Sequence, residues 1–216
     1  MVKKKIALPT RAQCQEIWDR YRTPLHIREH MKQANRVAVF LARKLKKAGE
    51  NVNIDLVDRA SLLHDTIRVT DMEPGSFERF PYTPSQEEIT AWKKQCEQFP
   101  PDVCHDQVNY EIFKEQFPEM AQVIRVHGVF DAPNVKTWEE KLVNYGDRRA
   151  SHDKIVTVKE RISDGEARYA AIHGRVSKTD PAAVKATYAI EQEIYSIIGG
   201  DPDKLNYDLE NEPEQW

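Results

Sequence analysis

Residues 53–67 read NIDLVDRASLLHDTI. Apolar residues recur in this stretch at helical spacing, which predicts an amphipathic helix with one buried face. His64 lies in line with that face and Asp65 follows it at the helix edge. A buried imidazole beside a carboxylate is costly unless a partner compensates it, and a metal ion is a usual partner. The stretch therefore predicts a helical core that carries ligand side chains.

Three further predicted helices, at about residues 26–48, 118–129 and 137–150, each carry a ligand-type side chain on the apolar face. In chain order these side chains are His30, His127 and Asp147. Ligands that arrive from separate helices are typical of a metal site built inside a helical bundle. The pattern therefore favours a metal-dependent enzyme.

Three of the candidate ligands have an alternative interpretation. His105 opens a helix after the proline-rich FPPDVC, so it is either a ligand or an exposed capping residue. His127 is either a ligand or a hydrogen-bonded core histidine. Asp153 lies near Asp147 in the chain and competes with it for the role of the last carboxylate.

The composition limits the classes of function. The chain has 216 residues, of which 40% are hydrophobic and 31% charged, with a formal net charge of −3. That charge offers no broad basic surface for nucleic acid. The three cysteines are odd in number and lack metal-type pairing, which indicates reduced thiols. With neither a bilayer-length apolar run nor a signal-peptide core after MVKKK, we expect a cytoplasmic protein that binds no membrane.

Proline, glycine and helix caps divide the chain into segments. We expect an all-α domain over about residues 1–200 and an acidic, flexible tail over 201–216. Residues 69–104 interrupt the helices with prolines and aromatic residues. This insertion follows the His-Asp helix directly, so it is either a lid or substrate wall or a merely structural connection.

The ligand-type residues follow one another as a histidine, a His-Asp pair and a distant aspartate. Residues 105–127 read HDQVNYEIFKEQFPEMAQVIRVH, and residues 141–162 read KLVNYGDRRASHDKIVTVKERI. In order, spacing and flanking apolar residues, the chain resembles the HD-domain superfamily over about residues 10–170. The resemblance implies an HD-domain-like helical bundle.

The resemblance also implies a ligand set for one or two divalent metal ions. Carried over to this chain, the ligands are His30, His64, Asp65 and Asp147 for one ion, and His105 and His127 for a second. The Asp65 carboxylate would bridge the two ions. Imidazoles mixed with carboxylates suit iron, manganese or a similar divalent ion better than a thiolate-loving metal.

The activity that the resemblance implies is metal-dependent phosphohydrolysis of a small phosphorylated metabolite or nucleotide. Asp65 and Arg68 would be catalytic, and Arg68 and Arg148 would bind substrate phosphate, since arginine can grip phosphate through two parallel hydrogen bonds. Both arginines could equally form only ion pairs with nearby acids.

Two other functions remain open from the sequence. Some members of the superfamily hold two irons with an equivalent six-ligand set and activate dioxygen, so the ligands alone do not separate a hydrolase from a di-iron oxygenase. The other function is that of a non-enzymatic sensor or scaffold that retains the fold. The sequence does not reveal the oligomeric state, and a homodimer is one option.

Overall fold

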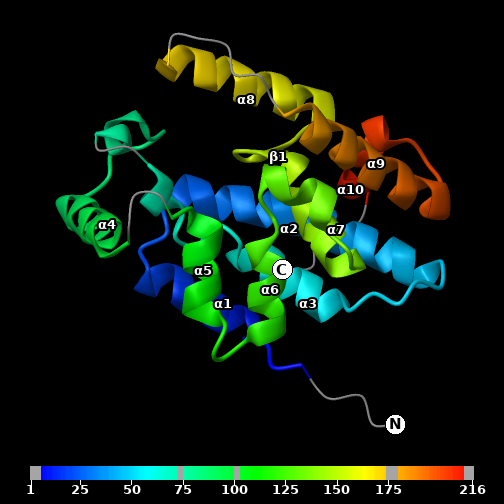
Figure 1. The fold of residues 1–216 in the computed structure, drawn as a ribbon, viewed down its shortest axis with the longest axis horizontal. Coiled ribbons are helices and arrows are strands. Elements are labelled where there is room, and N and C mark those ends of the chain that lie inside the picture. The colour runs from blue at the N-terminus through cyan, green and yellow to red at the C-terminus, as the bar shows by residue number, and fades with distance from the viewer. Residues whose placement is uncertain (1–5, 73–74, 100–102, 174–179, 212–216) are drawn as a thin grey trace.

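The computed structural model describes residues 6–72, 75–99, 103–173 and 180–211. Helices dominate these residues, and the predicted all-α class is confirmed (Figure 1). None of the described helices combines the length and apolar character that a bilayer crossing requires. The first seven α-helices are α1 (Arg11–Arg20), α2 (Leu25–Lys47), α3 (Ile54–Leu63), α4 (Gln86–Gln98), α5 (His105–Phe113), α6 (Pro118–Arg125) and α7 (Trp138–Arg148). The others are α8 (Val158–His173), α9 (Pro181–Ile198) and α10 (Leu205–Glu210), with 3₁₀ turns at η1 (Arg68–Asp71), η2 (Ser76–Arg79), η3 (Val129–Asn134) and η4 (Pro202–Lys204).

The long helix α2 is the centre of the core and runs through the middle of the molecule in Figure 1. It packs against α3 and α7, and these two helices also pack against each other. Met31 and Leu41 of α2, Leu63 of α3 and Leu142 of α7 are fully buried in the shared core. Each helix carries its candidate ligand on this same face, so burial of apolar surface also brings the ligands together.

Gly146 allows α7 to approach α2 closely. A Cβ atom at this position would lie 2.7 Å from the Ala34 carbonyl oxygen and 3.1 Å from the Ala38 Cβ atom. Two helices can approach this closely only where one of them has no side chain. Because Asp147 follows Gly146 directly, the contact sets the distance of its carboxylate from α2.

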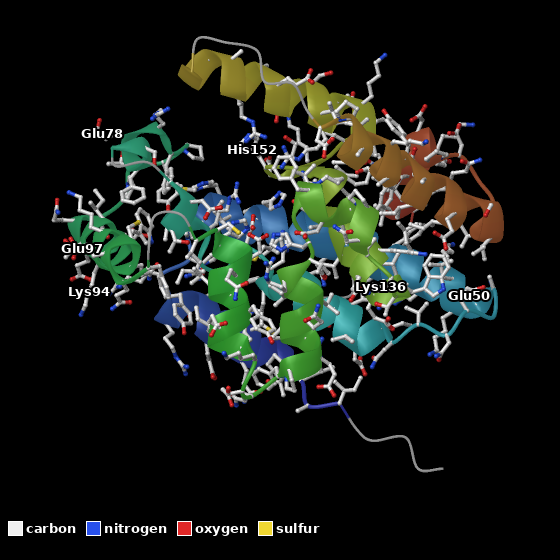
Figure 2. All side chains as sticks on the ribbon, in the orientation of Figure 1. Glu50, Glu78, Lys94, Glu97, Lys136 and His152 are labelled. Atoms are coloured by element: carbon white, nitrogen blue, oxygen red, sulfur yellow. The ribbon has the colours of Figure 1, made fainter. Side chains whose placement is uncertain are left out.

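The insertion predicted over residues 69–104 contains η1, η2 and α4. Val69, Phe77 and Trp92 form a small hydrophobic cluster of their own. The Trp92 Nε1–H donates to the Arg22 carbonyl oxygen at 2.7 Å, which ties the segment to the turn between α1 and α2. Figure 1 shows α4 at one end of the molecule. Figure 2 shows charged side chains on the outside of this segment: Glu78, Lys94 and Glu97.

A short hairpin follows α7, formed by β1 (Ala150–Ser151) and β2 (Lys154–Ile155). Arg149 lies just before it and is almost fully buried. Its guanidinium donates to the carbonyl oxygens of Val156 at 2.6 Å and Pro202 at 2.9 Å. These bonds join the hairpin to the C-terminal segment, so Arg149 has a structural role.

The segment that begins at Asp201 is helical where it is described. Leu205 and Leu209 of α10 are buried in the main core. The last five residues of the predicted tail, 212–216, lie outside the described residues. The predicted boundaries of the domain and its tail stay a prediction.

Candidate metal centre

The structure brings all six predicted ligands together in the interior. Their ligand atoms form overlapping groups of three, and within each group the atoms lie within 4.8 Å of one another. All six side chains are buried. The groups are His30, His64 and Asp65; His64, His127 and Asp147; and Asp65, His105 and His127. Asp153, the competitor of Asp147, belongs to none of the groups found among the described residues.

Asp65 lies between two pairs of histidines. Its Oδ2 atom is 3.9 Å from the Nε2 atoms of both His30 and His64. Its Oδ1 atom is 2.8 Å from the Nε2 atom of His105 and 3.4 Å from that of His127. One carboxylate therefore presents a different oxygen to each pair.

Asp147, from α7, lies beside the pair formed by His30 and His64. Its Oδ1 atom lies 2.8 Å from the Nε2 atom of His30 and 3.8 Å from that of His64. The neighbouring Arg148 contacts the other carboxylate oxygen, Oδ2. The carboxylate is thus held between the imidazoles on one side and a guanidinium on the other.

The hydrogen bonds of His64 and His127 leave a lone pair facing the centre. The Nδ1–H of His64 donates to the Ser61 carbonyl oxygen at 2.8 Å, and that of His127 donates to the Ile124 carbonyl oxygen at 2.6 Å. The Nε2 atom of His64 is buried without a hydrogen-bond partner among the described residues. A buried nitrogen lone pair directed at carboxylates fits a cation, because a metal ion is the partner that both kinds of group accept.

His105 is buried and is held by Asp71, a residue that the sequence pattern did not indicate. The His105 backbone N–H donates to Asp71 Oδ1 at 2.7 Å, and its ring Nδ1 lies 2.5 Å from Asp71 Oδ2. A carboxylate behind a histidine fixes the ring orientation and directs the other nitrogen toward a metal. Asp71 ends the turn η1 inside the insertion, where no helical period distinguishes it from its neighbours.

Electrostatics in the centre favour charged carboxylates. Burial opposes the charge on Asp65, but His64 and His105 outweigh it and hold the pKa of this carboxyl well below its usual range. Burial and the nearby Arg68 charge oppose protonation of His105. Asp65 and Asp71 outweigh them and raise the pKa of His105 to about 9. The Asp65 carboxylate therefore stays ionised and stabilises positive charge on the imidazoles around it, as it would on a bound cation.

A cavity of about 920 Å³ opens beside the ligand groups. Both predicted substrate residues, Arg68 and Arg148, line it. Each also has a carboxylate partner, because Arg68 Nη1 lies 3.1 Å from Asp71 Oδ2 and Arg148 contacts Asp147. Six residues of the insertion form part of the wall: Asp71, Met72, Ser76, Arg79, Phe80 and Cys104.

The buried histidine and aspartate groups could hold a metal ion. The donors are imidazole nitrogens and carboxylate oxygens, with no cysteine in any group found among the described residues. Comparisons of the chain with protein-family models, curated proteins and solved structures found no match.

Proposed function

We propose that the protein is an HD-type, metal-dependent phosphohydrolase that cleaves a phosphoester or phosphoanhydride of a small, nucleotide-like molecule. The observation that carries the proposal is the position of Asp65, whose two oxygens face two separate pairs of imidazoles beside an arginine-lined cavity. A carboxylate in that position suits a bridge between two cations.

His30, His64, Asp65 and Asp147 would hold one divalent ion, and His105 and His127 would hold a second, with Asp65 shared. Iron and manganese suit this donor set. A pair of divalent ions supplies Lewis-acid polarisation of phosphoryl oxygens and activation of water.

The chain's own residues would bind and orient the phosphoryl group. Arg68 lies beside Asp65 and Asp71 at the wall of the cavity, where its guanidinium can donate to phosphoryl oxygens while keeping its ion pair. Arg148 lies beside Asp147 on the same cavity. Asp65, whose low pKa keeps it ionised, would accept a hydrogen bond from the attacking water and fix its orientation.

The test is hydrolysis of p-nitrophenyl phosphate and a panel of nucleotides by protein purified without chelators, assayed with and without oxygen. We expect turnover that does not require oxygen. Asp65→Asn should lower turnover at least about 100-fold, since it removes a charged ligand shared by both groups. Asp55→Asn, which changes an exposed carboxylate near the start of the same helix, is the matched control and should leave turnover unchanged.

Either of two results would favour another function over the phosphohydrolase. Oxygen uptake that is obligatory for turnover, with no phosphate released, would favour the di-iron oxygenase. Absence of turnover on every substrate in protein that retains its metal would favour the non-enzymatic sensor or scaffold.

A further inference from the structure

The wall of the cavity formed by the hairpin and α8 carries basic side chains that the proposed chemistry does not use. Figure 1 shows α8 along one edge of the molecule. His152, at the tip of the hairpin, lies near the bundle-facing side of α8 in Figure 2. The residues of this wall that line the cavity are Ser151, His152, Arg161 and Arg168, and Arg148 at the end of α7 lines the cavity as well.

Arg161 is a mostly buried cation of this wall with an unused donor. Its side chain is 17% exposed, and its Nε atom is buried with no hydrogen-bond partner among the described residues. Burial is the largest cause that lowers the pKa of Arg161 to about 10. A buried guanidinium donor without an acceptor destabilises the folded protein, and an anionic ligand would remove that cost.

The carboxylate nearest to Arg161 is shared. Asp164 Oδ2 lies 3.8 Å from Arg161 Nη1 but 2.9 Å from Arg168 Nη2, and it also accepts from the Ser151 hydroxyl at 3.3 Å. A separation of 3.8 Å is too long for a hydrogen bond. Asp164 therefore pairs mainly with Arg168. Most N–H donors of the Arg161 guanidinium remain available to a ligand.

Two other arginines of the cavity, Arg68 and Arg125, differ in this respect. Arg68 lies 3.1 Å from Asp71, and the Arg125 Nε–H donates to the Gln107 side-chain oxygen at 2.6 Å. The Nε atom of Arg148, like that of Arg161, is buried without a hydrogen-bond partner among the described residues. The Arg148 charge also helps to lower the pKa of Arg161, so the unused donors of these two guanidinium groups lie near each other beside the cavity.

We propose that this wall is a second anion subsite, centred on Arg161 and assisted by Arg168, which binds a phosphate or equivalent anionic group other than the one at the ligand cluster. The inference rests on the proposed function, because it deepens the substrate class to molecules with two separate anionic groups. One cavity contains both the cluster and the wall, so a single small molecule can reach both. The guanidinium groups of Arg161 and Arg168 lie 3.8 and 2.9 Å, respectively, from the same Asp164 oxygen, and arginine binds phosphate through paired, charge-assisted hydrogen bonds.

The experiment measures binding with probes that cannot be hydrolysed. A series of alkane bisphosphonates of increasing length is titrated by calorimetry into the metal-loaded protein, each against its matched alkyl monophosphonate. We expect at least one bisphosphonate to bind about tenfold more tightly than its monophosphonate, as expected for one added charge-assisted hydrogen-bonded contact.

Variants then test which arginine causes the tighter binding of the bisphosphonate. Arg161→Gln should remove the bisphosphonate advantage while the monophosphonate affinity stays unchanged, and that second value also shows that the variant is folded. Arg161→Lys should keep part of the advantage, and Arg168→Gln should reduce it. Lys159→Gln removes an exposed charge from the same helix and should change neither affinity.

Equal affinities for the two probes at every length, or an advantage that persists in Arg161→Gln, would overturn the subsite. Turnover of p-nitrophenyl phosphate by the same samples separates this result from the proposed function. Turnover without a bisphosphonate preference would overturn only the subsite, whereas a preference without turnover would keep the subsite and overturn the phosphohydrolase.

Discussion

The Nε2 atoms of His105 and His127 lie 3.1 Å apart, although each ring uses its Nδ1 atom for a separate hydrogen bond. If both rings carried a hydrogen on Nδ1 alone, their Nε2 lone pairs would point at each other and at the Asp65 carboxylate. Positive charge between these atoms stabilises the arrangement, and a proton or a metal ion can supply it. A metal ion satisfies all three groups at once.

Asp71 is expected to tune metal binding without touching the metal, because it orients His105 from behind. Asp71→Ala should weaken metal affinity about 10- to 100-fold, the usual effect of losing such a partner. Calorimetric titration of metal into the demetallated protein measures this. Glu78→Ala, an exposed acid in the same segment, is the control; equal affinities for the two variants would contradict the positioning role.

Gly146→Ala is expected to push α7 away from α2. The added methyl group would lie 2.7 Å from the Ala34 carbonyl oxygen, which is backbone and cannot rotate away. We expect a loss of about 1–3 kcal/mol in the free energy of unfolding from overpacking, together with weaker metal binding because Asp147 moves with the helix. Urea denaturation and metal titration measure the two effects. Gly165→Ala, in α8 where nothing lies within 4 Å of the added atom, should show neither.

Asp58 is expected to be a stability residue outside the metal centre. Its carboxylate accepts two hydrogen bonds from Arg11, at 3.0 and 2.7 Å, and one from the buried Asn35 side chain at 2.9 Å. Asp58→Ala removes these three hydrogen bonds to a charged acceptor and should cost about 1–3 kcal/mol in the free energy of unfolding. Asp55→Ala, at the exposed start of the same helix, should cost less than about 1 kcal/mol. Similar losses for the two variants would rule out the network.

Protonation linked to His26 is expected to lower the free energy of unfolding in mild acid. Burial is the largest cause that depresses its pKa to about 4, and His152 and His30 lower it further. Its ring packs edge-on against Phe80 with centroids 4.3 Å apart. In the unfolded chain His26 binds a proton near its ordinary pKa of about 6.5, so the unfolded state gains protons first as the pH falls.

The folded protein should therefore lose stability between about pH 6.5 and about pH 4, and His26→Gln should lose less of it over the same range. Urea denaturation at about pH 7 and about pH 5 compares the two proteins. Parallel loss in both would show that His26 does not contribute to this pH dependence.

Much of the centre follows from helical periodicity. His30, His64 and Asp147 occupy positions in apolar stripes, and burial of those stripes brings them together. The partner of a buried ligand is harder to predict. Asp71 lies in a 3₁₀ turn with no repeating pattern, and its role depends on where α5 begins relative to that turn.

The environments of Arg161 and Leu205 were also beyond what the sequence could predict. Arg161 belongs to a helix with many charges, where a single arginine resembles a solvated surface residue until the cavity is known. Leu205 lies in an acidic stretch with few apolar residues, yet it is fully buried because the bonds of Arg149 hold the preceding turn against the hairpin. The environments of both residues depend on contacts between distant segments, which no local sequence pattern predicts.

The metal content of the protein tests the central claim most directly. Elemental analysis of protein purified without chelators should find a divalent transition metal in at least stoichiometric amount, and its removal should lower the melting temperature. The double variant His64→Ala, Asp65→Asn should contain almost none, while Asp55→Asn should retain the full amount. A wild-type protein that contains no metal and binds none of iron, manganese or similar divalent ions on titration would contradict the account.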